Sequence, residues 1–453
     1  MKKNETYTVE IIDQGFEGEG IAKIKEMTVF IEGAIKGEIV EILIVRVLSS
    51  FAYGKILKII KISNNRKEED CESYKRCGGC SLRHMNYFST LELKQNIVKN
   101  CLYKSLHRQV DVQECIGMEK PVAYRNKLIY PVGINKDNNY VMGVYAKRTH
   151  KIIETKHCYI QNEKNEEIAK FIFDFLVKEK IEPYNEEKKT GLVRHIMIRN
   201  GHKTGEIMVI LVIKNTKLSK EKELVEQLTK KYPEIKTVIK NINEKDTNVI
   251  LGKQNIVIHG DGYIYDKLGE YKFKISPLSF YQVNPIQTEV LYNIATEYAQ
   301  LTGKETIFDL YCGIGTIGIF ASKKAKKIYG IEVVEQAIED AKENATLNNI
   351  SKCEFMVGEV EKLLPKLVKK DEADVVFLDP PRKGCDKTAL DTLLEVKPKK
   401  IVYISCNPAT LARDVAILEK EYIIKKVQPV DMFPYTSHVE CVALLYLKGK
   451  KNK

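Results

Sequence analysis

The stretch TIFDLYCGIGTIGIF, residues 306–320, decides the fold of the C-terminal half of the chain. A short apolar run leads into three glycines, Gly313, Gly315 and Gly318, and then into a segment of helical character. The spacing G-x-G-x-x-G between a strand and a helix is typical of a nucleotide-binding turn. Glycine lets the backbone approach a ligand closely, and the first N–H groups of the helix are free to bind it. The stretch therefore predicts a nucleoside site at the carboxyl end of a buried strand.

Four further apolar runs follow, separated by amphipathic stretches of helical length: KIYGIE, CEFMVG, ADVVFLD and KIVYIS. Runs that are buried on both faces and joined by helical crossovers indicate a doubly wound parallel sheet. Two last runs, EYIIKKVQPVDMF and VECVALLYL, lie only a few residues apart, which predicts a hairpin at the edge of the sheet. We expect this Rossmann-like α/β domain to span residues 271–453.

Three acidic residues narrow the choice of ligand. Glu332 ends the run KIYGIE, where a carboxylate can accept hydrogen bonds from both hydroxyls of a ribose. This pattern also fits NAD, but Asp309 lies inside the strand before the glycines, an arrangement typical of S-adenosylmethionine sites. Asp379 stands in LDPPRKG, residues 378–384, where Asp-Pro-Pro makes a rigid turn at the end of the fourth run. Methyl transfer to a planar base often uses such a turn, whereas hydride transfer has no evident need of it, so the pattern favours S-adenosylmethionine.

The fifth run ends in a cysteine, within IVYISCNPATLARD, residues 401–414. Ligands of a doubly wound sheet lie outside the carboxyl ends of its strands, so we expect Cys406 to project into the crevice that holds Asp379. Pro408 suits the first turn of a helix, whose N–H groups would lower the pKa of the thiol. Cys406 is therefore predicted to be a partly ionised nucleophile, and Cys385 is a weaker rival in the same crevice.

Glu440 provides the second half of the predicted chemistry. It precedes the last strand within HVECVAL, near a turn, from which it could reach the same crevice. A thiol and a carboxylate beside a methyl donor suggest methylation of a pyrimidine, because carbon 5 of uracil is a poor nucleophile until a thiolate adds to carbon 6. A base must then remove the proton at carbon 5 so that the cysteine can leave. Cys406 and Glu440 fill these two roles.

The N-terminal part of the chain has a different pattern. Residues 5–62 contain strand-like runs rich in β-branched residues, which predict a β-barrel about the size of the five-stranded oligonucleotide-binding fold. After a polar linker at residues 64–70 we expect a helix over residues 87–106 and then a mixed α and β segment. That segment includes a hairpin over residues 192–213. The predicted domains are an RNA-binding barrel, a cluster-bearing central domain and a methyltransferase domain, spanning residues 1–62, 63–270 and 271–453.

Three closely spaced cysteines stand in CESYKRCGGC with the spacing C-x5-C-x2-C: Cys71, Cys77 and Cys80. This spacing predicts a metal site, whose fourth ligand is open among Cys101, Cys115 and Cys158. Four thiolates can hold zinc or an iron–sulfur cluster. Zinc ribbons usually show two C-x2-C pairs and only one exists here, so we favour a [4Fe–4S] cluster. The methylation chemistry needs no redox step, so the cluster is expected to order the RNA-binding region.

Composition sets the remaining expectations. Of 453 residues, 73 are Lys or Arg and 61 are Asp or Glu, which gives a net charge of +12. A basic excess favours a polyanion such as structured RNA through counterion release. No window approaches the roughly 20 apolar residues of a membrane span, and the start lacks the apolar core of a secretory signal. We expect a cytoplasmic protein with no membrane association and no obligate protein partner.

A set of motifs after the cysteines, SFYQVNP, DLYCGIG, DPPRKG, SCNPATLARD and HVE, resembles in type and order the TRAM-domain iron–sulfur RNA uracil-5 methyltransferases. These enzymes act on 23S ribosomal RNA, and the resemblance covers nearly the whole chain. It implies that Cys406 is the nucleophile, that Glu440 is the base and that Cys158 is the fourth ligand of the cluster.

The same resemblance implies further contacts. Residues at the positions that hold the methyl donor are Gln282, Tyr311, Glu332 and Asp379, beside the turn glycines Gly313 and Gly315. Phe280 matches an aromatic residue that stacks on the flipped base, and Arg125 in YRNK matches a basic residue expected to contact RNA.

Rival hypotheses stay open at this point. Cytosine-5 enzymes typically place a cysteine directly after a proline in the fourth-strand motif, where this chain has Arg382. Amine methylases usually have an aromatic residue there and need no thiol. Transfer RNA is an alternative substrate, because related uracil methylases act on it. A non-catalytic iron–sulfur RNA-binding protein could keep the fold, but the retention of Asp379, Cys406 and Glu440 argues against it.

Overall fold

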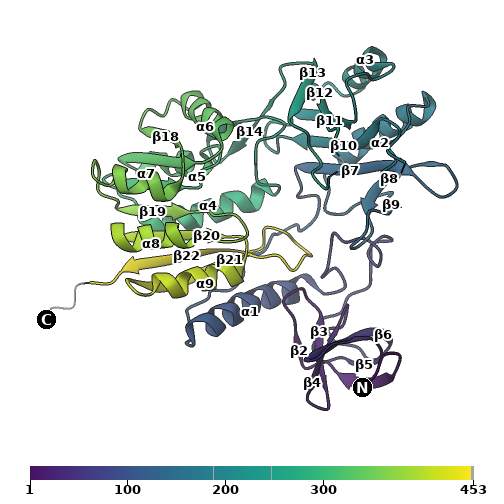
Figure 1. The fold of residues 1–453 in the computed structure, drawn as a ribbon, viewed down its shortest axis with the longest axis horizontal. Helices are drawn as coiled ribbons and strands as arrows, with labels where there is room; N and C mark the ends of the chain where they lie inside the picture. Colours follow the sequence, from purple (N-terminus) through teal and green to yellow (C-terminus); the bar gives the residue numbers. More distant parts are fainter. Residues whose placement is uncertain (187, 246, 450–453) are drawn as a thin grey trace.

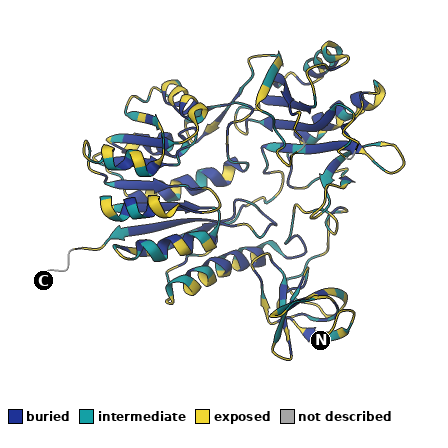
Figure 2. Ribbon diagram, viewed as in Figure 1, coloured by how far each residue is buried: buried dark blue, intermediate teal, exposed yellow. Residues whose placement is uncertain are grey.

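The structure is a computed structural model that describes residues 1–186, 188–245 and 247–449 (Figure 1). Three large sheets organise the described chain, and a separate two-stranded hairpin lies between the second and the third in sequence. Most buried residues lie on the strands and on the helix faces that pack against them, and the exposed residues lie on outer helix faces and loops (Figure 2). Within the described part of the chain, no helix is long and apolar enough to cross a membrane.

The C-terminal sheet has seven strands in the order β18-β17-β16-β19-β20-β22-β21. Their bounds are β16 (Thr306–Leu310), β17 (Lys327–Glu332), β18 (Cys353–Val357), β19 (Val375–Leu378), β20 (Lys400–Ser405), β21 (Tyr422–Val430) and β22 (Glu440–Leu447). Neighbouring strands are parallel except around β22, which runs antiparallel to both β20 and β21. The predicted doubly wound sheet and edge hairpin are confirmed, with β22 on the inside and β21 at the edge.

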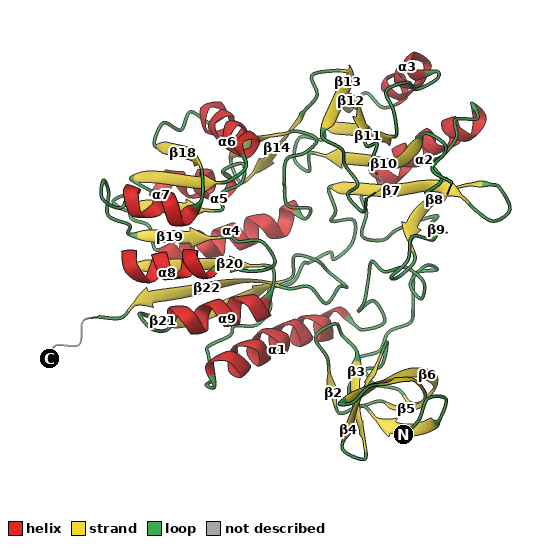
Figure 3. Ribbon diagram, in the orientation of Figure 1, coloured by secondary structure: helices red, strands yellow, loops and turns green. Residues whose placement is uncertain are grey.

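Helices cover both faces of this sheet (Figures 1 and 3). They are α4 (Pro285–Ala299), α5 (Thr316–Ala321), α6 (Glu335–Leu347), α7 (Val360–Leu367), α8 (Lys387–Val396) and α9 (Pro408–Leu418), with a 3-10 turn at Ser322–Lys324. The predicted helix over residues 87–106 is confirmed as α1 (Tyr87–Leu106). This helix packs against α9, and its apolar side chains join the core beneath α7, α8 and α9. A helix from the N-terminal third of the chain is therefore a layer of the C-terminal domain.

The order of the strands reverses between β16 and β19. From β16 the chain moves outward to β17 and β18, and it then returns to place β19 on the other side of β16. Doubly wound sheets bind their ligands at such a switch point, outside the carboxyl ends of the strands. The glycine turn that follows β16 and the Asp-Pro-Pro turn that follows β19 therefore face the same region.

The central sheet has the order β13-β12-β11-β10-β7-β8-β9. Its elements are β7 (Lys127–Ile134), β8 (Tyr140–Tyr145), β9 (Ile152–Glu154), α2 (Glu163–Lys178), β10 (Val193–Asn200), β11 (Ile207–Ile213), α3 (Glu221–Lys231), β12 (Ile235–Ile242) and β13 (Gln254–His259). The predicted hairpin over residues 192–213 is confirmed by the antiparallel pairing of β10 with β11. The separate hairpin, β14 (Ile264–Leu268) with β15 (Tyr271–Ile275), packs into the core of the C-terminal sheet, so residue 270 lies in its turn.

The N-terminal sheet has six strands in the order β1-β5-β6-β4-β3-β2. They are β1 (Thr6–Glu10), β2 (Asp13–Gln14), β3 (Gly20–Ile24), β4 (Met27–Ile31), β5 (Ile39–Val47) and β6 (Phe51–Lys61). Alternate residues of β4 and β5 point into one small core, which contains Val29, Ile31, Val40 and Ile42. The size of the unit agrees with the expected barrel, and the sixth strand arises because the two-residue β2 pairs with β3.

Candidate active site

The predicted nucleophile and base lie opposite each other at the side of the C-terminal sheet where its parallel strands have their carboxyl ends. Strands β20 and β22 pair Ser405 with Cys441, so Cys406 and Glu440 are the next residues outward on the two strands. Asp379 follows directly after β19, the neighbour of β20. The charges of Glu440 and Asp379 both act on the thiol of Cys406. The structure therefore brings together one thiol and two carboxyl groups that are separated by up to 61 residues in the sequence.

Glu440 is buried, with 3% of its surface exposed. Burial first and then the charge of Asp379 raise the pKa of its carboxyl group, Arg382 opposes them, and the pKa comes to about 8. A general base works best when its pKa lies near the operating pH. Glu440 is therefore poised to exchange a proton near neutral pH.

Cys406 is half-buried, and its thiol pKa is raised above the ordinary value, first by burial and then by the charges of Glu440 and Asp379. The prediction that the start of the following helix would lower this pKa is wrong. The side chain of Asn407 caps α9 by accepting a hydrogen bond of 3.1 Å from the backbone N–H of Ala409, so this N–H is already engaged. The charge of Arg382 and a backbone hydrogen bond of Cys406 itself lower this pKa and so favour the thiolate, but they do not outweigh the burial.

The rival thiol is less accessible. Cys385 has 5% of its surface exposed, and its thiol lies 3.7 Å from the hydroxyl of Tyr403. Burial raises the pKa of Cys385 to about 12. Cys406 is thus the more exposed thiol at this edge of the sheet.

The glycine turn leaves room for a ligand beside a carboxylate. Gly313 and Gly315 have φ angles of 54° and 78°, in the left-handed region that favours glycine. Apart from its two chain neighbours, a Cβ atom at Gly313 would meet no atom of the described residues within 4 Å, whereas one at Gly315 would clash with Phe355 at 2.8 Å. The backbone N–H of Gly313 donates a hydrogen bond of 3.3 Å to Glu332. Glu332 at the end of β17 therefore reaches the turn, as a ribose-binding carboxylate must.

Asp309 supports the same turn from inside the strand. It is fully buried, and one of its carboxyl oxygens accepts a hydrogen bond of 2.8 Å from the backbone N–H of Gly318. Its other oxygen, Oδ1, has no hydrogen-bond partner among the residues that the structure describes. Burial raises the pKa of Asp309 to about 7, and it raises that of Asp379 to about 7 as well. Buried polar atoms normally have partners, so the free Oδ1 atom fits a ligand that binds at this turn.

Tyr311 occupies an unusual backbone position directly after β16. Its φ angle of 67° is left-handed, which is uncommon for a tyrosine and is typical of residues at functional sites. Its backbone N–H donates a hydrogen bond of 2.9 Å to Ile331, and its hydroxyl group interacts with the thiol of Cys385. Its predicted contact with the methyl donor stays a prediction.

The central sheet holds the loop that carries Phe280 and Gln282. The guanidinium group of Arg199 on β10 donates hydrogen bonds to the carbonyl oxygens of Ser276 (3.2 Å) and Ser279 (2.8 Å). The side chain of Asn126 donates one of 2.9 Å to the carbonyl of Gln282. Between these anchors, Phe280 is 71% exposed, so an aromatic ring stands free on a fixed loop.

Arg199 was not predicted from the sequence. Its burial lowers its pKa to about 10, and a buried cation persists only where it makes strong contacts. The signal that could have revealed it is an arginine directly after the apolar residues IMI in VRHIMIRN, residues 193–200.

The four cysteines of the predicted cluster line one cavity. Its volume is about 240 Å³, and its lining contains Cys71, Cys77, Cys80 and Cys158. The other two candidates, Cys101 and Cys115, pack at the hydrophobic core beneath α1. Across the described ranges, no group of three or more His, Cys, Asp or Glu side chains has the arrangement that holds a metal ion. The structure therefore gathers the thiols around one space without showing a metal site.

Two arginines complete the lining of this cavity. Arg83 and Arg125 both border it, and Arg83 Nη1 and Arg125 Nε are buried without hydrogen-bond partners among the described residues. Arg125, for which the family resemblance implies a contact with RNA, thus lies beside the cysteines. These two free N–H donors beside the thiols suit an anionic occupant.

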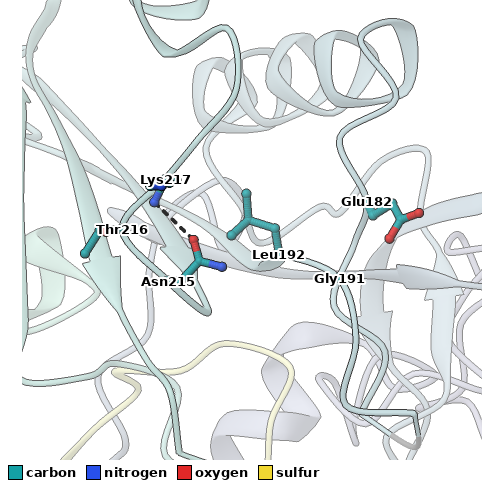
Figure 4. A pocket seen from close by; sticks show the side chains of 6 residues that line it. All are labelled: Glu182, Gly191, Leu192, Asn215, Thr216 and Lys217. Carbon is teal, nitrogen blue, oxygen red and sulfur yellow. Dashed lines mark hydrogen bonds between the residues drawn. The ribbon is translucent and has the colours of Figure 1, made fainter.

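A second hollow lies on the central domain (Figure 4). It has a volume of about 540 Å³ and is lined by Glu182, Gly191, Leu192, Asn215, Thr216 and Lys217. The backbone N–H of Lys217 donates a hydrogen bond of 3.0 Å to the side chain of Asn215. None of the predicted catalytic or cofactor residues borders it, so we assign no chemistry to this hollow.

Two family models match the chain. A TRAM domain model matches residues 2–57, and the model described as tRNA (uracil-5-)-methyltransferase matches residues 86–448. The first covers the N-terminal sheet up to residue 57, within β6, and the second covers every predicted site residue except three of the cluster cysteines.

Similar proteins agree with these matches. An uncharacterized RNA methyltransferase of Clostridium tetani is 49% identical over 100% of this chain and 99% of its own length. One of Oceanobacillus iheyensis is 46% identical over 99% and 98% of the two chains. The crystal structure of Pyrococcus abyssi tRNA (uracil-54, C5)-methyltransferase with S-adenosyl-L-homocysteine has a TM-score of 0.76 and 28% identity. It covers 97% of this chain and 100% of its own.

Proposed function

Because the chain belongs to the tRNA (uracil-5-)-methyltransferase family and is an S-adenosylmethionine-dependent RNA methyltransferase, we propose that it methylates carbon 5 of uridine through a covalent adduct of Cys406. The observation that carries this proposal is the position of Cys406 opposite Glu440 at the strand ends, with Asp379 beside them. Amine methylation needs no such thiol.

The reaction begins with a uridine that is flipped out of folded RNA. Unstacking costs a few kcal/mol. Phe280 supports the base, because an exposed aromatic ring contributes about 1–3 kcal/mol per stacked base. The anchors from Arg199 and Asn126 keep this ring in place, so little further entropy is lost when the base binds.

The thiolate of Cys406 then bonds to carbon 6 of the uracil, and the electrons of the 5,6 double bond move toward the carbonyl oxygen at carbon 4. When bound, S-adenosylmethionine supplies a methyl group from its sulfonium, which carbon 5 accepts. Glu332, Asp309 and the Gly313 backbone would hold the donor. We assign Gln282, Tyr311, Gly315 and Asp379 to the same site.

Glu440 completes the turnover. It takes the proton from carbon 5, the 5,6 double bond forms again, and the sulfur of Cys406 leaves as a thiolate. A carboxyl group whose pKa is about 8 can accept this proton and return it to water near neutral pH. The negative charge of Glu440 disfavours a thiolate at Cys406. Once Glu440 has taken the proton and is neutral, the thiolate can leave more easily.

We further propose that the cysteine cavity holds a [4Fe–4S] cluster on Cys71, Cys77, Cys80 and Cys158. Support comes from the four-thiol donor set around one space and from the two arginines beside it, whose charge suits an anionic cluster. The reaction needs no electron from such a group. Its role here is to hold together two segments that are 78 residues apart, Cys80 and Cys158.

The proposed substrate is a uridine of 23S ribosomal RNA, from the resemblance of the cysteine spacing and motifs. Transfer RNA is the second candidate, since the solved relative of Pyrococcus abyssi acts on uracil-54 of tRNA. Mass-spectrometric mapping of 5-methyluridine in both RNAs separates them, with cells that lack the protein complemented by the wild type or by Cys406→Ser. We expect the ribosomal modification to return with the wild type alone. Its return with Cys406→Ser would refute the covalent mechanism, and its return in tRNA alone would refute the ribosomal assignment.

A further inference from the structure

The connection between β21 and β22, residues 431–439, leads directly to Glu440. The second half of this connection is bound by the cysteine segment, residues 71–83. The backbone N–H of Leu82 donates a hydrogen bond of 2.9 Å to the carbonyl of Tyr435, and the backbone N–H of Ser437 donates one of 2.9 Å to Oγ of Ser81. Ser81 is the residue directly after Cys80, so only one peptide unit separates a cysteine of the cavity from this contact.

Arg83 strengthens the same attachment. Its guanidinium group lies 4.9 Å from the ring centre of Tyr435 and 4.3 Å from that of Tyr159, the residue after Cys158. It also pairs with Asp70, the residue before Cys71, at 2.5 Å. Arg83 thus joins the β21–β22 connection to both parts of the chain that line the cysteine cavity.

Tyr435 needs this support. Its φ angle of 63° is left-handed, a backbone conformation that a bulky residue keeps only where its surroundings enforce it. Only 7% of its surface is exposed, and its neighbour Thr436 lines the cysteine cavity itself. The strained turn is therefore fixed from the side of the cysteines.

The first half of the connection has a different anchor. Lys94 on α1 forms a fully buried ion pair with Asp431 and donates a hydrogen bond of 3.1 Å to the carbonyl of Phe433. This anchor fixes the beginning of the connection independently of the cysteines. The Ser81 contact lies three residues before Glu440, so it controls how the last part of the connection enters β22.

We propose that Ser81 and Arg83 are positioning residues for Glu440, and that the cysteine segment thereby sets the rate of proton removal from carbon 5. This inference rests on the proposed function. Glu440 is the first residue of β22, three residues after the amide that Ser81 holds, so the direction of its carboxyl group depends on the path of this connection. Cys406 lies on the other strand, after β20, and has no part in the connection. Loss of the Ser81 contact should therefore slow elimination and leave the addition of Cys406 unchanged.

The test is Ser81→Ala in the full-length protein, with Ser81→Thr as the conservative variant that keeps the hydroxyl group. Ser437→Ala is the matched control, because the donor at residue 437 is the backbone N–H and survives the substitution. Glu440→Gln provides the reference for blocked elimination. RNA tritiated at carbon 5 of uridine reports elimination, and the fraction of protein crosslinked to methylated RNA reports the adduct.

For Ser81→Ala we expect tritium release to slow about five-fold, as for the loss of one neutral hydrogen bond, while the methylated adduct accumulates. Ser81→Thr and Ser437→Ala should behave as the wild type does, and the affinity for S-adenosylmethionine should not change. Amide hydrogen exchange supplies a readout that does not depend on turnover. The amide of Ser437 should exchange faster in Ser81→Ala and at the wild-type rate in Ser81→Thr.

Equal slowing of adduct formation and tritium release in Ser81→Ala would overturn the inference, and so would no change in either. Arg83→Lys is a second variant. Lysine keeps the positive charge that pairs with Asp70 but loses the planar guanidinium that stacks on the ring of Tyr435, so the methylated adduct should accumulate in this variant too. Should Glu440→Gln form no adduct at all, the proposed covalent mechanism itself would fail. Accumulation in Glu440→Gln without accumulation in Ser81→Ala or Arg83→Lys would refute the positioning role alone.

Discussion

Glu440→Gln should stabilise the protein while it stops turnover, and the stabilisation should grow with pH. The pKa of Glu440 is raised from 4.5 to about 8 because the carboxyl group is buried beside Asp379. Between these two values the folded state keeps a proton that the unfolded chain has released. The contribution of Glu440 to the free energy of unfolding of the wild type therefore falls as the pH rises from about 4.5 to about 8, and it is constant above that pH. Glutamine carries no charge, so the variant escapes this loss.

The magnitude follows from the two pKa values. At about 1.36 kcal/mol per pKa unit, the carboxyl group of Glu440 lowers the free energy of unfolding by about 1 kcal/mol at pH 5 and by about 5 kcal/mol at pH 9. The gain of Glu440→Gln over the wild type should thus rise by up to about 4 kcal/mol between these pH values. A residue that served the fold would show the opposite sign, because its replacement destabilises.

Urea unfolding at pH 5, 7 and 9 measures this difference, with tyrosine fluorescence as the signal because the chain has 24 tyrosines and no tryptophan. Glu395→Gln on α8 is the control, since Glu395 is exposed and its replacement should not produce a gain that depends on pH. A constant or falling gain for Glu440→Gln across the pH range would refute the assignment of Glu440 as a strained, buried base.

Three further substitutions test other parts of the structure. Phe280→Ala should weaken binding of the RNA substrate by about 1–3 kcal/mol through lost base stacking, whereas Leu278→Ala, two residues away and also exposed, should leave the RNA dissociation constant unchanged; equal effects would exclude stacking. Lys94→Met should reduce the free energy of unfolding in urea by about 3–5 kcal/mol, because it leaves Asp431 buried and unpaired, and a loss below about 1 kcal/mol would show that the pair is not buried in solution. Cys80→Ala should lower the iron content per chain of protein purified without oxygen, and unchanged iron would place any cluster elsewhere.

Regular patterns made the C-terminal fold predictable. Runs buried on both faces alternate with helical stretches, and the structure places these runs in one parallel sheet with the glycine turn after β16. The strand ends then determine where Cys406 and Asp379 lie, since every parallel strand delivers its carboxyl end to the same edge. Glu440 joins them because the β22 strand is antiparallel, so that its first residue reaches that edge.

Contacts between distant segments could not be predicted in this way. Nothing in the local sequence links Lys94 to Asp431, which are 337 residues apart, or Ser81 to Ser437, which are 356 apart. The raised pKa of Cys406 was missed for a related reason. The helix that follows it is visible in the sequence, but the burial of the thiol and the approach of Glu440 depend on packing.

The most direct test of the covalent mechanism uses RNA that contains 5-fluorouridine, incubated with the protein and S-adenosylmethionine. Fluorine at carbon 5 cannot leave as a proton does, so the adduct should persist and methylated nucleotide should remain on the peptide that contains Cys406 after digestion and mass spectrometry. A nucleotide attached to Cys385, or no attached nucleotide from protein that methylates normal RNA, would contradict the mechanism.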